Sequence, residues 1–475
     1  MNARLFGVPA RTWLVATLAG IGVGFVYALS PLTVWFALAM YALVRCAVQN
    51  LDDNERRQVA ILLVVAIALR TIAVAVLFVM TNHEQVPFGR FFGDEEFYLR
   101  HSIWLRNIGV GIPVQASDFA FAFDTLGWTS YLYVLAFLQV LVGPAPYGVH
   151  LFGAALYLTA AVVLFRTVRP VFGGAPSLMG LTVLLYLPSL FAWSISALKE
   201  PLYFLATACA IALAVKLTRD RRLGVRVIVL AALVALVSVI GTIRDGGAVL
   251  AGGGILAGLA AAWIVRRPWA VAALVVLLPI AAGLTLRVPR TQIRAYNLLQ
   301  SAARLHRAFI ETPGWVYTLL DQRFYDDGQA ITDMRFDEAA RYVVRAAERY
   351  VTVPLPWEAK SPAAVAYLPE QVLWYVLVAL LPIGLLFSLR RDVVLTMILC
   401  GVTVVSASAI ALLNGNVGSL VRLRVLAIPY LTWLSMVGLC ELLARASQHP
   451  DSAVGVVQGF SPAHSTGRRP RTTNS

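Results

Sequence analysis

The sequence predicts an all-α protein: a polytopic transmembrane helix bundle with a small extracytoplasmic helical domain. Hydrophobic residues make up 59% of its 475 residues and charged residues only 13%. A soluble chain of this length would need more polar surface to cover its cores. Apolar stretches of about 17 to 25 residues recur along the chain and match the thickness of a bilayer's hydrocarbon core. We therefore expect about 12 to 13 hydrophobic helices.

The predicted helices follow one another with few interruptions. Ser30-Pro31 divides the first apolar stretch, because proline disfavours helix at the residue before it, so residues 1–58 are expected to form a signal-anchor helical hairpin. The hydrophobic segments are 12–29, 31–47, 59–80, 129–143, 147–168, 176–193, 201–217, 226–242, 246–265, 269–286, 371–389, 393–413 and 425–443. Residues 129–168 must cross the membrane an odd number of times, so the short segment 129–143 is expected to be re-entrant or interfacial.

Four regions follow the hairpin. They are a transmembrane core over 59–286 that contains the first outer loop 81–128, an extracytoplasmic loop domain over 287–370, C-terminal transmembrane helices over 371–445, and a disordered cytoplasmic tail over 446–475. Within the loop domain, apolar residues at spacings of three or four predict an amphipathic helix over 335–350, with Asp333 available as a cap. Its predicted apolar face consists of Phe336, Ala340, Val343, Ala347 and Tyr350.

The net charge of +14 does not indicate nucleic-acid binding, because the basic residues are spread over the connections between apolar segments. Short basic connections mark the cytoplasmic side of a membrane protein. Placing them inside puts residues 81–128, 194–200, 243–246, 287–370 and 414–424 on the outer side. The four cysteines lie in apolar segments without metal-ligand spacing, so no metal site is predicted. The sequence indicates no required cofactor. It leaves open whether a divalent cation takes part.

Four basic residues depart from the positive-inside trend, since each lies at or near an outer helix end. They are Lys199, Arg244, Arg422 and Arg424. Arginine presents a fork of donors that matches phosphate oxygens, so this group predicts a site for the phosphate of a lipid carrier. The alternative is that helix-end charges with an adjacent acid, as in Lys199-Glu200, only anchor a helix.

A run of three acids, Asp94, Glu95 and Glu96, lies on the same predicted side. Adjacent carboxylates repel one another, which is costly unless a cation or a proton-transfer role offsets the repulsion. We predict that Asp94 accepts a proton from an attacking hydroxyl and that Glu95 or Glu96 orients the acceptor or a cation. The alternative is a solvated loop whose charges contact nothing. Arg70, in the middle of segment 59–80, is expected to be functional or paired, with a partner that the sequence does not identify.

The first outer loop, which opens with Gly93-Asp94-Glu95 and continues to Tyr98, resembles that of the GT-C superfamily of membrane glycosyltransferases, including the protein mannosyltransferase and aminoarabinose transferase branches. Further segments similar to bacterial members are Tyr131-Leu132-Tyr133, Phe152-Gly153, Leu187-Pro188, Trp193 to Glu200, and Asn414 to Gly418 leading to Arg422-Leu423-Arg424. The resemblance implies a polyprenyl-phosphate-sugar donor, an acceptor outside the cytoplasm, and a catalytic Asp in the first outer loop, which matches Asp94. The family's second loop acid has no clear counterpart, although Asp118 and Asp124 are candidates.

The sequence thus favours an inverting glycosyltransferase of the bacterial cytoplasmic membrane, with its active site on the extracytoplasmic face. It would move a hexosyl or pentosyl unit from a polyprenyl-phosphate-linked donor to a glycan, lipid or protein of the cell envelope. Membrane lipids are further expected partners, and nucleic acid is not. One alternative is a polysaccharide polymerase or ligase that acts on lipid-pyrophosphate oligosaccharides. An alternative of another class is a transporter or lipid flippase, which predicts charges at mid-membrane and broken helices.

Overall fold

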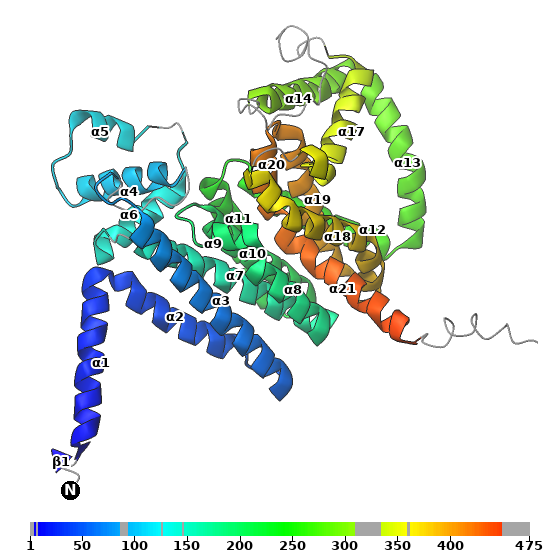
Figure 1. Cartoon of the computed structure of the whole chain (residues 1–475). Coiled ribbons are helices and arrows are strands. Elements are labelled where there is room, and N and C mark those ends of the chain that lie inside the picture. Colours follow the sequence, from blue (N-terminus) through cyan, green and yellow to red (C-terminus); the bar gives the residue numbers. More distant parts are fainter. Residues whose placement is uncertain are drawn as a thin grey trace, which may run out of the picture.

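The computed structural model describes residues 4–5, 8–85, 94–124, 127–144, 147–308, 334–358 and 362–448. Apart from a two-residue antiparallel pairing of β1 (Arg4–Leu5) with β2 (Val8–Pro9), its regular structure is helical (Figure 1). Six described helices are long and apolar enough to cross a membrane, or up to nine if each of three bent pairs is one span. The chain is therefore a polytopic helical bundle, with fewer full-length spans than the hydrophobic segments predicted.

The N-terminal half consists of helices α1 to α10, with α1 directed away from the bundle (Figure 1). The helices are α1 (Ala10–Leu29), α2 (Pro31–Ala47), α3 (Asp53–Met80), α4 (Glu95–Gly109), α5 (Ala116–Ala122), α6 (Ser130–Val142), α7 (Gly148–Phe172), α8 (Gly174–Tyr186), α9 (Pro188–Ser194) and α10 (Glu200–Arg219). The break between α1 and α2 falls at Ser30, as the proline predicts.

The C-terminal half completes the bundle and adds the helices of the loop domain. Its helices are α11 (Leu223–Ile243), a π-helical turn (Val249–Gly253), α12 (Gly254–Val265), α13 (Pro268–Arg287), α14 (Pro289–Ala308), α17 (Phe336–Thr352), a 3-10 turn (Pro356–Glu358), α18 (Pro362–Arg391), α19 (Val393–Leu413), α20 (Val417–Leu423), a 3-10 turn (Arg424–Leu426) and α21 (Ile428–Gln448). The segment 446–475 lies outside the described residues beyond Gln448.

The predicted segment 176–193 is not one straight helix. It divides at Leu187 into α8 and α9, whose axes differ by 63°. Pro188 has no N–H, so the carbonyl of Leu184 loses its helical partner and instead accepts a hydrogen bond from the Tyr157 hydroxyl at 2.8 Å. Proline therefore sets the break, and a side chain from α7 satisfies the carbonyl it leaves open.

A second pair of backbone groups at this break is satisfied from two other helices. In a continuous helix the N–H of Ser189 would bond to the carbonyl of Leu185. Here the Leu185 carbonyl accepts from Arg70 at 3.0 Å, while the Ser189 N–H donates to Glu370 at 2.9 Å. Arg70 also donates to the Ser194 hydroxyl at 2.8 Å and is fully buried. The partners of Arg70 that the sequence could not identify are thus polar groups of α8 and α9.

Helices α6 and α17 can each be compared with a segment predicted from the sequence. Helix α6 has 13 residues, a length of about 20 Å, which agrees with the expectation that 129–143 does not cross the membrane alone. Helix α17 matches the predicted amphipathic helix, but its buried face is Ala339, Tyr342, Ala346 and Tyr350. The prediction was wrong by one position at Ala340, Val343 and Ala347, which are exposed, Val343 by 39%, whereas Tyr350 is buried as predicted. The proposed cap Asp333 lies outside the described residues.

Helices α18 and α21 approach closely at two glycines. An added Cβ at Gly438 would lie 2.7 Å from the Leu380 carbonyl oxygen and 2.7 Å from the Gly384 nitrogen. Membrane helices associate through such close backbone contact, because lipid offers no hydrophobic drive between helices. This contact holds α21 against α18 and, through the turn before α21, positions Arg424 and α20.

Candidate functional site

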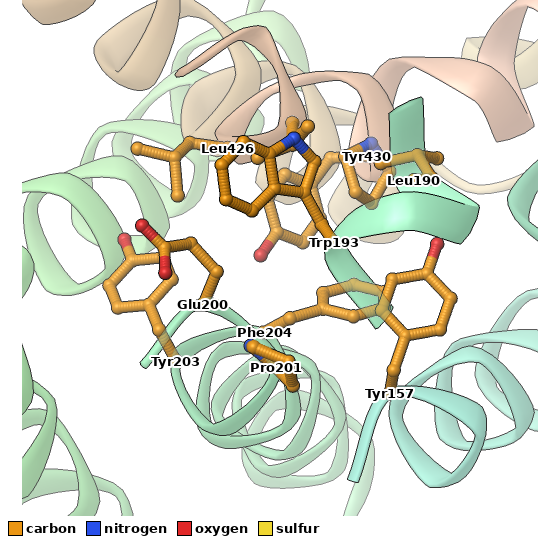
Figure 2. A pocket seen from close by; sticks show the side chains of 11 residues that line it. Tyr157, Leu190, Trp193, Glu200, Pro201, Tyr203, Phe204, Leu426 and Tyr430 are labelled. Carbon is orange, nitrogen blue, oxygen red and sulfur yellow. The ribbon is translucent and has the colours of Figure 1, made fainter. Parts of the chain in front are cut away.

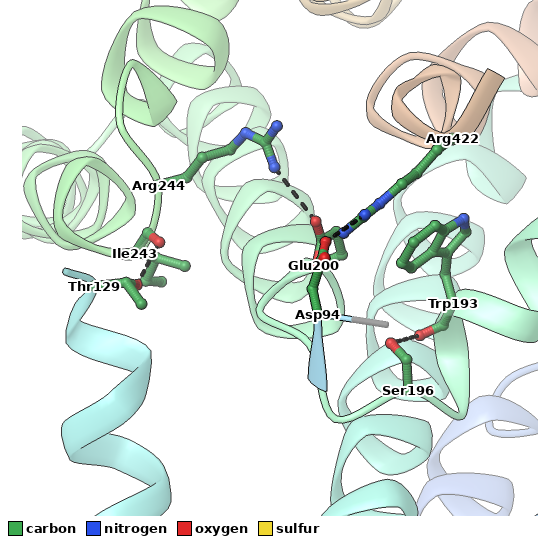
Figure 3. A network of polar contacts seen from close by, with 8 residues as sticks. All are labelled: Asp94, Thr129, Trp193, Ser196, Glu200, Ile243, Arg244 and Arg422. Carbon is green, nitrogen blue, oxygen red and sulfur yellow. Dashed lines mark hydrogen bonds and ion pairs between the residues drawn. The ribbon is translucent and has the colours of Figure 1, made fainter. Parts of the chain in front are cut away.

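Five charged side chains from four segments of the chain meet at one end of the bundle, and all of them except Lys199 are drawn in Figure 3. We call Asp94, Lys199, Glu200, Arg244 and Arg422 the charged cluster. Asp94 precedes α4, Lys199 and Glu200 begin α10, Arg244 follows α11, and Arg422 lies in α20. The structure therefore brings together four of the sequence-predicted site residues and adds Glu200, which the sequence suggested only as a neighbour of Lys199.

Asp94 and Arg422 form the most direct contact in the cluster. The Arg422 Nη1 atom lies 2.5 Å from Asp94 Oδ2, and the guanidinium stacks 4.5 Å from the centre of the Trp193 ring. Asp94 is 56% exposed and Arg422 34% exposed, so water and ligands can reach the pair. An accessible arginine that is paired with a carboxylate can exchange that carboxylate for an incoming anion.

Glu200 and Arg244 form a second pair across two helices. Arg244 Nη1 lies 3.5 Å from Glu200 Oε1, whereas the sequence suggested that Glu200 pairs with the adjacent Lys199. The end of α11 is held in place because the Thr129 hydroxyl donates to the Ile243 carbonyl at 2.6 Å (Figure 3). The second Glu200 oxygen, Oε2, is buried and has no hydrogen-bond partner within the described structure.

The charges of the cluster shift the pKa values of two side chains, Tyr98 and Lys199. Burial, together with the charges of Glu200 and Asp94, raises the pKa of Tyr98 to about 12, while Arg244 and Arg422 oppose the rise. Burial and the neighbouring Arg244 lower the pKa of Lys199 below its ordinary value of 10.5, against the charge of Glu200. The Lys199 ammonium also lies 5.9 Å from the Tyr98 ring centre. The charges are therefore close enough to act on one ligand.

The turn between α9 and α10 is built by serine side chains and positions Trp193. The Ser196 hydroxyl donates to the Trp193 carbonyl at 2.7 Å, a local bond that favours a turn over a helix (Figure 3). The turn lies directly against α7 at Gly153, where an added Cβ would be 2.6 Å from the Ser196 carbonyl oxygen. The residue at position 153 must therefore be small for Trp193 and Lys199 to keep their places.

Glu95 does not have the predicted role of orienting an acceptor or a cation. It is fully buried, and its Oε1 accepts a hydrogen bond from the Ala197 N–H at 2.6 Å. His150, also buried, lies 3.8 Å away. Glu95 thus fastens α4 to the turn before α10 and positions Asp94. Glu96 pairs with Arg100 at 2.5 Å on the exposed side of α4, where both side chains line the same open cleft as Asp94.

Arg424 is the one predicted phosphate ligand that the structure places elsewhere. It is fully buried and donates to the carbonyls of Tyr350 and Val353 and to the Gln371 side chain. It also lies 4.9 Å from the centre of the Trp374 ring. With these donors engaged inside the protein, Arg424 joins the end of α17 to α18 and is not available to a phosphate.

Two cavities meet at the start of α10. An open cleft with about 1110 Å³ of empty space is lined by Lys199 together with Asp94, Glu96, Tyr98 and Arg100. A narrow pocket of about 20 Å³, room for about one water molecule, lies beside Glu200 and is lined mainly by apolar and aromatic side chains (Figure 2). Its lining includes Tyr157, Trp193, Tyr203, Phe204 and Tyr430. The arrangement suits a ligand with an anionic, polar part and an apolar part.

Three residues at the site, Glu200, Trp193 and Tyr98, were not predicted as site residues. The sequence features that could have indicated them differ. Glu200 and Trp193 lie in the Trp193-to-Glu200 segment, whose similarity to other proteins pointed at the right region. Tyr98 stood at the end of the acidic motif. Among the described residues, no three His, Cys, Asp or Glu side chains are grouped so as to hold a metal ion. No protein-family model and no curated protein matches this chain.

Proposed function

We propose that this chain is an inverting membrane glycosyltransferase that moves a sugar from a polyprenyl-phosphate-linked donor to an acceptor of the cell envelope. The observation that carries the proposal is the charged cluster at the junction of an open polar cleft and an aromatic pocket. Three cations and two carboxylates leave a net positive charge for a phosphate. The aromatic pocket places apolar surface next to the cluster, and the cleft has room for a sugar and an acceptor.

The proposed chemistry uses Asp94 as the general base. The acceptor hydroxyl oxygen attacks the anomeric carbon, the bond from that carbon to the phosphate oxygen breaks, and the hydroxyl proton passes to Asp94. The electron pair leaves with the lipid phosphate, which Arg422, Lys199 and Arg244 stabilise through charge. Because Arg422 holds Asp94 at 2.5 Å, the donor phosphate would draw Arg422 away and release the carboxylate as the site fills. The base would then be active mainly in the loaded site.

The experiment uses the purified full-length chain in lipid nanodiscs, supplied with labelled polyprenyl-phosphate sugars and envelope fractions as acceptors. We expect label to move to the acceptor, and Arg422→Ala to raise the donor KM and lower kcat together. Arg57→Ala, an exposed arginine in the first turns of α3, is the matched control and should leave both constants unchanged. Absence of transfer from every donor sugar, with the protein folded, would contradict the proposal.

A polymerase or ligase acting on lipid-pyrophosphate oligosaccharides is a second candidate, favoured by the three cations of the cluster. It would depend on Arg422 with less need for Asp94 as a base. Loss of activity in Arg422→Ala together with an active Asp94→Asn would support it. The broken helix α8–α9 is a feature also expected of a transporter or flippase, but its open backbone groups are satisfied by Tyr157, Arg70 and Glu370.

A further inference from the structure

A second cleft lies at the far end of the helices that carry the charged cluster. Helix α10 starts at Glu200 and has 20 residues, so its last turn lies about 30 Å away, close to the thickness of the hydrocarbon core. There a cleft with about 740 Å³ of empty space opens between α7 and α10. It therefore lies at the level of the opposite membrane surface from Asp94.

The walls of this cleft explain why it is open. Ala212, one turn before Lys216, is small, and Pro170 interrupts the hydrogen-bonding pattern of α7 across from it. Proline at this position leaves the carbonyl of Arg166 without its helical N–H partner. The cleft thus combines a local gap in side-chain volume with an irregular helix segment.

The charge of the cleft is predominantly positive. Arg166, Lys216 and Arg219 line it together with a single acid, Asp220, so its formal balance is +2. Arg219 pairs with Asp392 of α19 at 2.8 Å, which holds its guanidinium in place. Arg166 donates to carbonyls at the end of α2, those of Cys46 and Gln49.

Lys216 differs from these two arginines. It is exposed, and its side chain forms no hydrogen bond or ion pair within the described structure. A lysine ammonium that shares a cleft with two guanidinium groups is repelled by them, and a bound anion would relieve that repulsion. The basic residues that follow it, such as Arg221 and Arg226, are also exposed but do not line the cleft.

We propose that this cleft binds a phosphate group, with Lys216 as its main free ligand and Arg166 and Arg219 as fixed positive neighbours. The position of the cleft in the membrane favours the headgroup of an anionic phospholipid as the source of this phosphate, because the cleft lies where headgroups meet the bundle. The inference does not depend on the proposed sugar transfer. It gives the molecule a second anion site, on the membrane face opposite the charged cluster.

The test uses the full-length protein in a neutral detergent, with phosphatidylglycerol and phosphatidylcholine offered separately and bound lipid counted by native mass spectrometry. We expect retention of phosphatidylglycerol over phosphatidylcholine, weakened about fivefold by Lys216→Ala, since one lysine near an anionic surface contributes about 1 kcal/mol. Arg226→Ala, a basic residue at the same end of the bundle outside the cleft, should not weaken it. Lys216→Arg should restore binding.

Inorganic phosphate and glycerol 3-phosphate identify the source of the phosphate group. Retained lipid that these soluble anions do not displace points to the headgroup, whereas binding of the soluble anions alone, lost in Lys216→Ala, points to free phosphate. Equal binding by Lys216→Ala, Arg226→Ala and the unmodified protein would overturn the proposal. Unfolding temperatures of all variants, expected to be unchanged because Lys216 has no protein partner, confirm that folding does not account for the result.

Discussion

At the scale of single residues, the direction in which each charged side chain points decides its role. Successive helical residues are rotated by about 100°, so neighbours in sequence face different ways. Asp94 contacts Arg422, Glu95 enters the core, and Glu96 pairs with Arg100 on the outside. The acidic run and the outer basic residues could therefore be predicted as a region, but their separate roles could not.

The same geometry explains the error over Arg424. Residues two apart on a helix lie on nearly opposite faces. Because Arg422 faces Asp94, Arg424 turns toward the protein, where it contacts Tyr350 and Trp374. The charge of Arg424 and its predicted side of the membrane do not indicate which way its side chain points. Its position on the helix relative to Arg422 does. The buried acid Glu200 was harder to predict, because its partner Arg244 is brought near only by the packing of α10 against α11.

Lys199 gives a pH prediction at this scale. Its pKa is lowered by burial and by Arg244, so the ammonium loses its proton at a lower pH than an ordinary lysine. A deprotonated Lys199 no longer attracts a phosphate, so donor affinity should fall as pH rises, beginning before the ordinary value of 10.5 is reached. Donor KM measured across the alkaline range should rise in the unmodified chain. Lys199→Arg keeps its charge and should show a flatter profile; a rise identical in both would exclude Lys199 as the titrating group.

At the scale of elements, the break between α8 and α9 is what places Trp193 beside Arg422. The dipeptide Leu187-Pro188 predicts an interruption, but the sequence does not show which groups satisfy the freed backbone. Those groups come from α3, α7 and α18, at sequence distances of 115, 27 and 181 residues from their partners. Arg70, which stood out in the sequence as a charge inside a span, acts here as a positioning residue of this break.

We predict that Arg70→Leu destabilises the protein and disturbs the site together. The substitution leaves the Leu185 carbonyl buried without its partner, at a cost of about 1 to 3 kcal/mol. Thermal unfolding in detergent should show a lower midpoint, and the fluorescence of Trp193, read against Trp193→Phe, should change. Arg57→Ala, an exposed residue of the same helix, should change neither. A normal unfolding midpoint in Arg70→Leu would contradict the role assigned to Arg70.

At the scale of the whole molecule, composition predicted the class of fold and only part of its layout. Mean apolarity and segment length indicate spans, but they do not distinguish a straight span from a bent pair such as α8–α9. They also do not reveal where two helices come into backbone contact, because a glycine in an apolar segment looks the same in lipid and at an interface. The approach of α18 to α21 at Gly384 and Gly438 is such a contact.

The bundle predicts a large effect of Gly438→Val. Its side chain would require α21 to move away from the Leu380 carbonyl, which disrupts close packing over a long interface. We expect a lower unfolding temperature and reduced binding of any ligand that uses Arg422, since α20 precedes α21 directly. Gly22→Val is the matched control, because an added Cβ at Gly22 meets nothing within 4 Å. Equal stability of the two variants would show that this contact does not hold the bundle.

The most direct test of the central claim is the rate of sugar transfer in Asp94→Asn, measured in membranes with saturating polyprenyl-phosphate-linked donor and compared with Asp53→Asn, an exposed acid at the start of α3 that does not line the cleft. Asparagine preserves the size of the side chain but cannot accept the acceptor's proton. The account predicts a fall in kcat of at least about 10²-fold for Asp94→Asn with donor binding retained, and near-normal transfer for Asp53→Asn. Near-normal transfer by Asp94→Asn would contradict it.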